Sequence, residues 1–288
     1  MKILVVGGGI AGLTIGWRLA QSGYHVGVIE RGRAGRSATW AAAGMLGSAG
    51  EHVANPAMSA LAAEARAMWP AFASDLAAAS GHEFGFCRNG ALRAAFDAGE
   101  CAAFATRARE LVAVGDAAEW VDAATARKIA PLIASDVLGA LFFRDEAQVD
   151  NRRLSVALVA ALTRAGGVLH EGVNVHSLSV VENRITGVVT TTGNLRADAV
   201  VIAAGAWSAL LGANLPEIRP AKGQMLALAP DGNDHLPIPT LWGPGIYLVP
   251  RNGRLFVGAT VEDVGFDTSV TRAAHDTLLA RAHRLAPG

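Results

Sequence analysis

Six residues near the N-terminus have the types and spacing of a turn that binds a dinucleotide. The run Gly7-Gly8-Gly9-Ile10-Ala11-Gly12 fits G-x-G-x-x-G, and an acid, Glu30, ends the next apolar run. The first glycine permits the sharp turn, the second lets the backbone approach a pyrophosphate, and the third lets helix and strand pack closely. A carboxylate at the end of the second strand binds ribose hydroxyls and disfavours a dinucleotide with a 2′-phosphate. Arg31 beside it could bind such a phosphate, so that alternative stays open. We therefore predict a dinucleotide site that includes Gly7, Gly9, Ile10, Ala11, Gly12, Glu30 and Arg31.

The elements around this turn strengthen the prediction. Glycine accounts for 33 of the 288 residues, so the pattern alone could be a glycine-rich turn with an acid nearby by chance. However, it follows a continuous apolar run at 2–6, opens an amphipathic pattern at 10–22 and precedes an apolar run at 26–29. This order predicts a parallel βαβ unit with a right-handed crossover, in which the helix N-terminus points at the phosphates.

The stretch TWAAAGMLG, residues 39–47, uses small side chains in another way. One bulky residue, Trp40, is followed by three alanines, a glycine and a methionine, with no charge. The three-ring plane of a flavin needs close main-chain approach on one side, and larger side chains would hold the backbone off the ring. We interpret the stretch as a wall along a flavin. The alternative is an alanine-rich helix start packed in a core.

The remaining elements follow from hydrophobic periodicity and capping signals. Helices are predicted at 57–79, with a kink at Pro70, at 99–115, between a cap at Asp122 and Pro131, and at 151–165 after a cap at Asp150. Strands are predicted at 138–143 and 199–203, with short antiparallel strands between them after residue 166, joined by turns at "EN" and "TGN". Further strands are predicted at 219–228, 246–249 and 254–260.

These elements predict an α/β fold made of two interleaved domains. A parallel-sheet, dinucleotide-binding domain is expected to take residues 1–85 and 140–220. A mainly antiparallel α+β substrate domain is expected to take residues 86–139 and 221–288.

Composition narrows the class of partner. Lys plus Arg and Asp plus Glu are 25 each, so the net charge is zero, and no basic tract favours nucleic acid or an anionic membrane. The N-terminal apolar run is interpreted as a buried strand and not a signal peptide, and no apolar run is long enough to span a bilayer. Two cysteines and scattered histidines predict neither a disulfide framework nor a metal site. A cytoplasmic protein is expected, and its oligomeric state, a homo-oligomer included, stays open.

The stretch from Glu30 through RGRAGRSATWAAAGMLG resembles the FAD-dependent D-amino-acid oxidase superfamily, most closely the glycine oxidases of thiazole (thiamine) synthesis. The segments GGVLHEGVNV, VVIAAGAWS, PAKGQMLAL and IYLVPRNGRLFVGAT are similar to the same family, so the resemblance covers nearly the whole chain. It implies a glutathione-reductase-like FAD-binding domain with FAD as the cofactor. It also implies cofactor contacts at Ala38, Thr39, Ala42, Ala43, Gly44, Met45, Val175, Gly205 and Trp207.

The resemblance further implies the reaction. It is the oxidation by FAD and oxygen of a small amino acid or secondary amine, such as glycine or sarcosine, to an imine that hydrolyses to an oxo acid, with hydrogen peroxide as the second product. Tyr247 would be the catalytic-pocket residue that orients the carboxylate, and Met45 and Trp242 would border the substrate. The alternative is that Tyr247 is an ordinary core residue, because strands favour aromatic side chains in any core. Trp40, Trp242 and Val261 depart from the residues usual in the family, which leaves the identity of the amine open.

Two other functions stay open at this point. One is a related amine or D-amino-acid dehydrogenase that passes electrons to a carrier instead of oxygen. The other is a chain that binds FAD without doing chemistry, because members of the family continue beyond the equivalent of the final RAHRLAPG. By resemblance, that continuation carries the arginine that binds the substrate carboxylate. Arg251 and Arg254 flank a strand turn and are expected to be solvated.

The 288-residue chain is therefore expected to oxidise glycine poorly. Tyr247 alone offers the carboxylate one neutral hydrogen bond, worth about 1 kcal/mol, whereas a bidentate arginine adds charge and a fixed angle. Peroxide formation from glycine, sarcosine and D-alanine should be compared between this chain and one extended by a family-like C-terminal segment. Fast turnover by the 288-residue chain, saturating at low substrate, would contradict the expectation.

Overall fold

The computed structural model describes residues 1–47, 55–212, 215–229 and 239–287. The chain divides into two compact units, each built from three segments. Unit 1 contains Met1–Ala42, Ala71–Gly85 and Asp150–Pro220, and unit 2 contains Ala43–Pro70, Phe86–Val149 and Ala221–Gly288. Relative to the domain boundaries expected from the sequence, residues 43–70 and 140–149 fall in the other unit.

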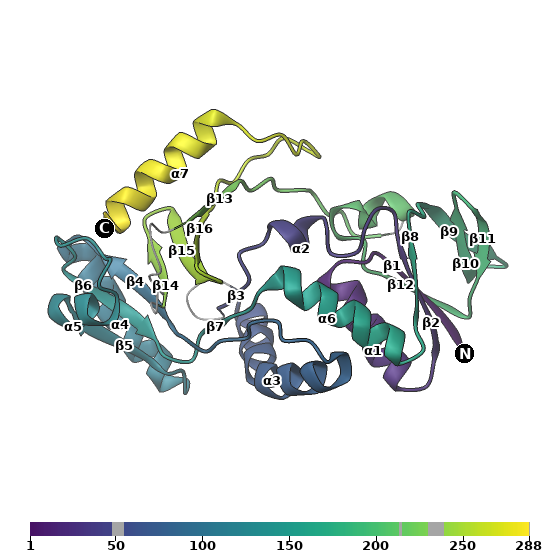
Figure 1. Ribbon diagram of the computed structural model, residues 1–288, viewed down its shortest axis with the longest axis horizontal. Helices are drawn as coiled ribbons and strands as arrows, with labels where there is room; N and C mark the ends of the chain where they lie inside the picture. The colour runs from purple at the N-terminus through teal and green to yellow at the C-terminus, as the bar shows by residue number, and fades with distance from the viewer. Residues whose placement is uncertain (48–54, 213–214, 230–238, 288) are drawn as a thin grey trace. The chain divides into compact units, whose positions relative to one another are not determined.

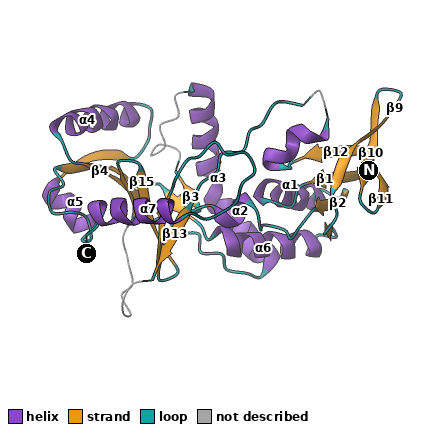
Figure 2. Cartoon of the chain, turned by 90° about the horizontal axis from the view of Figure 1, so that it is seen from above, coloured by secondary structure: helices purple, strands orange, loops and turns teal. Residues whose placement is uncertain are grey.

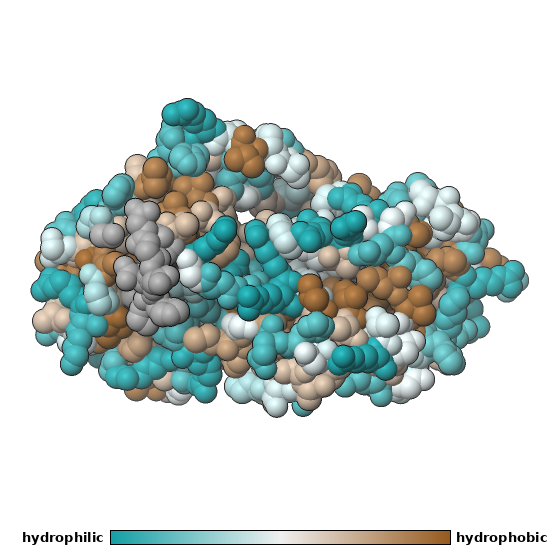
Figure 3. Space-filling model, in the orientation of Figure 1, coloured by the Kyte–Doolittle hydropathy of each residue, from teal (hydrophilic) through white to brown (hydrophobic). Residues whose placement is uncertain are grey.

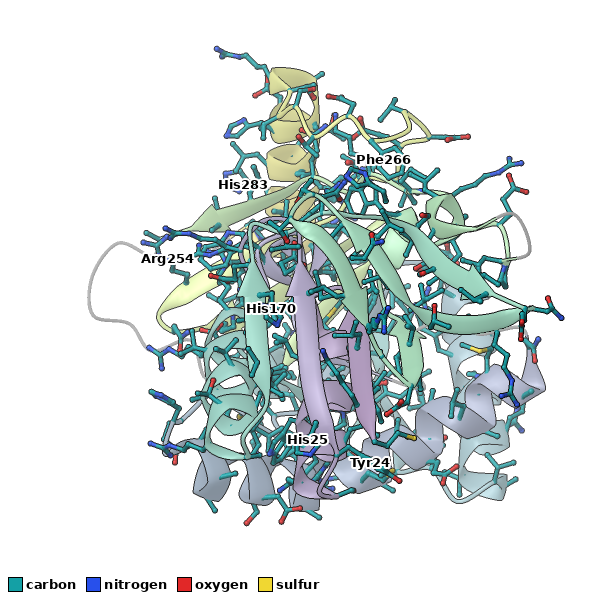
Figure 4. All side chains as sticks on the ribbon, turned by 90° about the vertical axis from the view of Figure 1, so that its right-hand side faces the viewer. Tyr24, His25, His170, Arg254, Phe266 and His283 are labelled. Carbon is teal, nitrogen blue, oxygen red and sulfur yellow. The ribbon has the colours of Figure 1, made fainter. Side chains whose placement is uncertain are left out.

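Unit 1 is organised around a four-stranded parallel sheet with the order β12-β1-β2-β8. The strands are β1 (Lys2–Val6), β2 (His25–Glu30), β8 (Val168–Glu171) and β12 (Ala199–Ile202). Figure 4 looks onto this sheet, with His25 on β2 and His170 on the neighbouring β8. The parallel sheet and its βαβ unit confirm the fold class predicted from the sequence.

Two helices of unit 1 pack on each other beside this sheet, as Figure 1 shows. These are α1 (Ile10–Gln21) and α6 (Asn151–Arg164). A Cβ at Gly16 would lie 2.7 Å from a methyl of Val28, so α1 lies very close to β2. Asp150 caps α6 as predicted, because its Oδ1 accepts hydrogen bonds from the backbone N–H of Arg152 (2.9 Å) and Arg153 (3.1 Å).

Unit 1 also carries an antiparallel three-stranded sheet formed by β9 (Val175–Val181), β10 (Arg184–Thr190) and β11 (Gly193–Arg196). The predicted turn at "EN" is confirmed: Glu182 and Asn183 both have positive φ, of 50° and 59°, as the two-residue hairpin turn with matching twist requires. A 3₁₀ helix, η1 (Gly205–Leu211), follows β12.

Unit 2 contains a seven-stranded sheet with the order β13-β16-β15-β14-β4-β6-β5. All its neighbouring pairs are antiparallel except β14 with β4. The strands are β4 (Ala91–Ala95), β5 (Ala118–Asp122), β6 (Gly139–Phe143), β13 (Met225–Leu228), β14 (Thr240–Gly243), β15 (Ile246–Arg251) and β16 (Arg254–Gly258). A short ribbon, β3 (Met45–Leu46) with β7 (Ala147–Gln148), completes the unit's strands among the residues described.

Helices cover both faces of this sheet, with α4 (Ala98–Ala113) on one side and α7 (Arg272–Leu285) on the other (Figure 2). Leu278 and Leu285 of α7 join a core with Leu92, Leu241 and Leu248, together with α5 (Ala123–Ile129), which Asp122 caps as predicted. On the opposite face, α4 packs on β4, β5 and β6, while the part of the face formed by β15 and β16 carries Tyr247, Val249 and Phe256.

A polar network fixes the loop that precedes α7. Gln224 accepts a hydrogen bond from the backbone N–H of Thr271, the N-cap of α7, and donates to Glu262 (2.8 Å each). Lys222 Nζ lies 2.6 Å from Asp267 Oδ2, and this hydrogen bond holds the pKa of Asp267 well below its usual range. The carboxylate therefore stays charged down to strongly acidic pH.

In the part of the chain that the structure describes, the longest helix is α3 (Pro56–Ser80), which contains Pro70. The division between the two units falls at this proline. Among the residues described, no helix combines the length and apolar character that crossing a bilayer requires. The face drawn in Figure 3 carries both apolar and polar patches.

Candidate functional site

The turn after β1 is built so that only glycine fits. Gly7 has φ +110°, and a Cβ there would lie 2.3 Å from the carbonyl oxygen of Ala203. A Cβ at Gly12 would lie 1.9 Å from the carbonyl oxygen of Gly7. These approaches give the first and third glycines of the motif the roles that the sequence predicts for them.

The N-terminus of α1 has the features of an anion site. Its N-cap is Gly9, which offers no side chain to the first-turn N–H groups. The hydroxyl Oγ1 of Thr39 accepts a hydrogen bond from the N–H of Ile10 (3.0 Å) and would lie 3.4 Å from a Cβ at Gly9. The turn therefore brings Gly9, Ile10 and Thr39 together, and the N–H groups and dipole of the helix favour a phosphate there.

Glu30 is held by the backbone on both of its oxygens. Oε2 accepts from the N–H of Gly8 (2.8 Å), and Oε1 accepts from the N–H of Gly32 (2.9 Å). A carboxylate has about four acceptor positions, so two contacts leave room for ribose hydroxyls. The carboxylate is thus aimed and fixed before any ligand binds.

The side chains of two other predicted residues stack on each other beside this acid. The guanidinium carbon of Arg31 lies 3.7 Å from the centroid of the Trp207 ring, a cation–π contact. Trp207 lies in η1, which Gly205 begins with a positive φ of 55°. The structure therefore brings Glu30, Arg31, Gly205 and Trp207 to one end of the parallel sheet.

Val175, one of the predicted cofactor contacts, begins β9 in unit 1. The side chain of Val175 is buried in a core with Leu4 and Val188. Two residues earlier, Val173 donates its N–H to the carbonyl oxygen of Glu30 (3.0 Å). Val173, which lies in the segment GGVLHEGVNV, thus connects the residues before β9 to the end of β2.

The first half of the small-residue stretch belongs to unit 1 and forms the one-turn helix α2 (Ala38–Ala41). Trp40 is stacked between the guanidinium groups of Arg36 and Arg152, whose carbons lie 3.6 Å and 4.1 Å from its ring centroid. Asn151 donates its side-chain N–H to the carbonyl oxygen of Thr39, and Arg152 donates to that of Trp40. Ala38 and Ala42 stay exposed, so α2 is held through its backbone and Trp40.

The second half belongs to unit 2 and is extended. Ala43 is buried against Val249 and Phe256. Gly44 has φ +84°, and a Cβ there would lie 2.0 Å from the carbonyl oxygen of Val149. The carbonyl oxygen of Gly44 in turn accepts the N–H of Val149 (2.8 Å). Only glycine therefore fits at position 44, where the stretch faces Val149.

The predicted substrate residues gather on one face of the seven-stranded sheet. Tyr247 belongs to the same apolar cluster as Ala43, Met45 and Met225, and its hydroxyl lies 3.8 Å from the sulfur of Met225. The rings of Trp242 and Tyr247 are 5.3 Å apart. Gly258, which pairs with Tyr247 across β15 and β16, leaves room for the tyrosine ring, since a Cβ there would lie 2.5 Å from the ring. Met45, Trp242 and Tyr247 thus lie together within unit 2, whereas Val261 is 86% exposed.

The expectation that Arg251 is solvated is wrong. It is only 7% exposed, with Nη1 donating to the carbonyl oxygen of Ala43 (2.9 Å) and its guanidinium carbon 3.9 Å from the centroid of the Phe256 ring. Arg254, labelled in Figure 4, is exposed as expected. The two residues pair directly across the β15–β16 hairpin.

The comparisons with known proteins agree with this arrangement. A model of the DAO family, described as FAD dependent oxidoreductase, matches residues 2–288. The chain is 37% identical over 292 residues to the bifunctional protein ThiO/ThiG of Synechocystis sp., covering 99% of this chain and 42% of that protein. It is 33% identical over 297 residues to the glycine oxidase of Geobacillus kaustophilus, covering 99% of this chain and 76% of that protein.

A solved structure shares the fold. The crystal structure of glycine oxidase from Geobacillus kaustophilus superposes with a TM-score of 0.92 at 32% identity, covering 99% of this chain and 78% of that one. The chain spans less than half the length of the ThiO/ThiG relatives that it matches. Since the family match runs almost from end to end and the fold agrees with it, the chain belongs to the DAO family of FAD-dependent oxidoreductases.

Proposed function

We propose that the protein is an FAD-dependent oxidase of a small amino acid or secondary amine such as glycine or sarcosine. The amine loses a hydride from its α-carbon and a proton from its nitrogen. The resulting imine takes up water to give an oxo acid and ammonia or a primary amine. Oxygen accepts the two electrons and two protons and leaves as hydrogen peroxide. Relatives named glycine oxidase and ThiO/ThiG support this substrate class and a link to thiamine biosynthesis.

The observation that carries the proposal is the cluster of Ala43 and Met45 with Tyr247. It joins a small-residue stretch, suited to a flat ring, to an aromatic hydroxyl suited to a carboxylate. In the proposed site, Tyr247 donates its hydroxyl to the substrate carboxylate, and Met45 and Trp242 border the α-carbon and exclude water. FAD, when bound, accepts the hydride, so no acid–base pair of side chains is required.

The proposed cofactor contacts are described for each unit separately. In unit 1, the first-turn N–H groups of α1 bind the pyrophosphate, and Glu30 binds the ribose hydroxyls. The remaining contacts there are Gly7, Gly9, Ile10, Ala11, Gly12, Arg31, Ala38, Thr39, Ala42, Val175, Gly205 and Trp207. In unit 2, Ala43, Gly44 and Met45 offer the flavin ring their backbone.

Replacing Glu30 by Ala is expected to weaken FAD binding. Hydrogen bonds to a charged group contribute about 1.5–3 kcal/mol, which corresponds to roughly a ten- to hundredfold rise in Kd. Titration of apoprotein with FAD, followed by flavin fluorescence, measures the change. Glu83→Ala, which removes an exposed carboxylate of unit 1 outside the predicted contacts, is the control. Tight binding of NADH with no affinity for FAD would contradict the flavin assignment.

Enlarging the buried alanine of the stretch is expected to disturb the flavin. Ala43 is 5% exposed, and Leu there adds volume where packing leaves none, at a cost of about 1–3 kcal/mol. Ala62→Leu, on α3 and outside the stretch, is the control. The visible spectrum and FAD affinity should change in the first variant only. The same response in both would place the stretch in an ordinary core.

Flavin reduction by a small amine tests the reaction itself. Glycine or sarcosine, added without oxygen to the FAD-loaded chain, should bleach the flavin in a single turnover. Admission of air should then yield one peroxide per imine, whereas less peroxide would favour a dehydrogenase that uses a carrier. Tyr247→Phe should weaken amine binding about fivefold, the equivalent of one neutral hydrogen bond.

The matched control for this variant is Tyr24→Phe, because Tyr24 is 40% exposed in unit 1 (Figure 4). It should bind the amine as the unchanged chain does. FAD-loaded protein that no small amine bleaches would overturn the proposed function.

A further inference from the structure

Arg251 is a buried cation that contacts the small-residue stretch and its support. Its Nη1 donates to the carbonyl oxygen of Ala43 at 2.9 Å, and the same nitrogen would lie 3.1 Å from a Cβ at Gly44. Its guanidinium carbon lies over the ring of Phe256, which belongs to the same apolar cluster as Ala43. The side chain is therefore both a donor to the stretch and part of the surface on which the stretch rests.

The residue before it holds the other strand of the same ribbon. The carbonyl oxygen of Pro250 accepts a hydrogen bond of 2.6 Å from the side chain of Gln148. Gln148 pairs in register with Met45 through the β3–β7 ribbon. The last two residues of β15 thus fix both strands of the ribbon: Arg251 reaches the β3 side and Pro250 reaches the β7 side.

The same strand carries the proposed substrate residue. Tyr247, Val249 and Arg251 alternate along β15 and therefore project from one face of the sheet. Tyr247 contacts the cluster that contains Ala43 and Met45, and Arg251 bonds to the backbone of that same stretch. One rigid strand consequently sets both the position of the tyrosine and the position of the stretch.

We infer that Arg251 is a positioning residue, which fixes the backbone of Ala43–Met45 against β15 so that the stretch and Tyr247 keep one spacing. This inference rests on the proposed function, since it adds a reason why those residues bind flavin and substrate together. Arg251 acts through the Ala43 carbonyl group and is not assigned a contact with either ligand. A charged donor suits this task, because its hydrogen bond to a buried carbonyl is stronger than a neutral one.

Three variants separate positioning from plain stability. Arg251→Met keeps an unbranched side chain but removes the donors and the charge. Arg251→Lys keeps the charge and one donor. Leu278→Ala is the control, because Leu278 is fully buried on the other face of the same sheet and its loss destabilises unit 2 without touching the stretch.

Hydrogen exchange of the apoprotein is the first measurement, since it needs no ligand. Amides of residues 43–47 should exchange about tenfold faster in Arg251→Met than in the unchanged chain, with a smaller increase in Arg251→Lys. In Leu278→Ala the increase should appear in α7 and not in 43–47. Unchanged exchange of 43–47 in Arg251→Met would overturn the inference.

FAD binding is the second measurement. Arg251→Met should raise the Kd for FAD about tenfold and change the visible circular dichroism of the bound flavin. Arg251→Lys should recover part of both, and Leu278→Ala should leave both within twofold. Equal losses in Arg251→Met and Leu278→Ala would show a merely structural role and overturn the inference.

Ala43→Leu, measured alongside, separates this inference from the proposed site. Loss of FAD affinity in Ala43→Leu but not in Arg251→Met overturns the role of Arg251 and leaves the proposed site standing. Normal affinity in both variants overturns the proposed site together with the inference. Loss in both, with partial recovery in Arg251→Lys, supports both.

Discussion

Close contact of backbone with backbone is the constraint on which this structure depends. At Gly7, Gly12 and Gly44, an added Cβ would lie within 2.3 Å of a carbonyl oxygen, which no side chain can tolerate. Two of these contacts set the turn that leads from β1 into α1, and the third sets the stretch that leads into β3. Each leaves N–H or carbonyl groups and bare backbone on its free side, which is the surface that a flat or phosphorylated ligand can approach.

Features that depend on local chemistry could be predicted from the sequence. The glycine turn, the helix after it, the caps at Asp122 and Asp150 and the hairpin at Glu182–Asn183 each require particular residues within a few positions. These appear in the structure where the sequence placed them.

Features that depend on distant partners were missed. Strand β4 reads ALRAA, which has neither alternation nor β-branched residues, and it is a strand because β14 and β6 flank it. Helix α7 buries Ala274, Leu278, Ala282 and Leu285 at helical spacing, but half of this stripe is alanine, so its periodicity is weak. Arg251 looked solvated because it borders a tight turn, and its burial depends on Ala43, 208 residues away in the chain.

Residues 147–152 hold the small-residue stretch separately in each unit. In unit 2, Gln148 pairs with Met45 and Val149 bonds to Gly44. In unit 1, Asn151 and Arg152 bond to the carbonyl groups of Thr39 and Trp40. Each of these contacts lies within a single unit, although the division between units falls at Ala42 in one segment and at Val149 in the other. Several backbone groups of the stretch are therefore already satisfied by protein. The carbonyl oxygen of Ala43 also accepts a hydrogen bond from Arg251, and Ala43 is buried against Val249 and Phe256. A run with so little side-chain chemistry is thus held in place through its main chain.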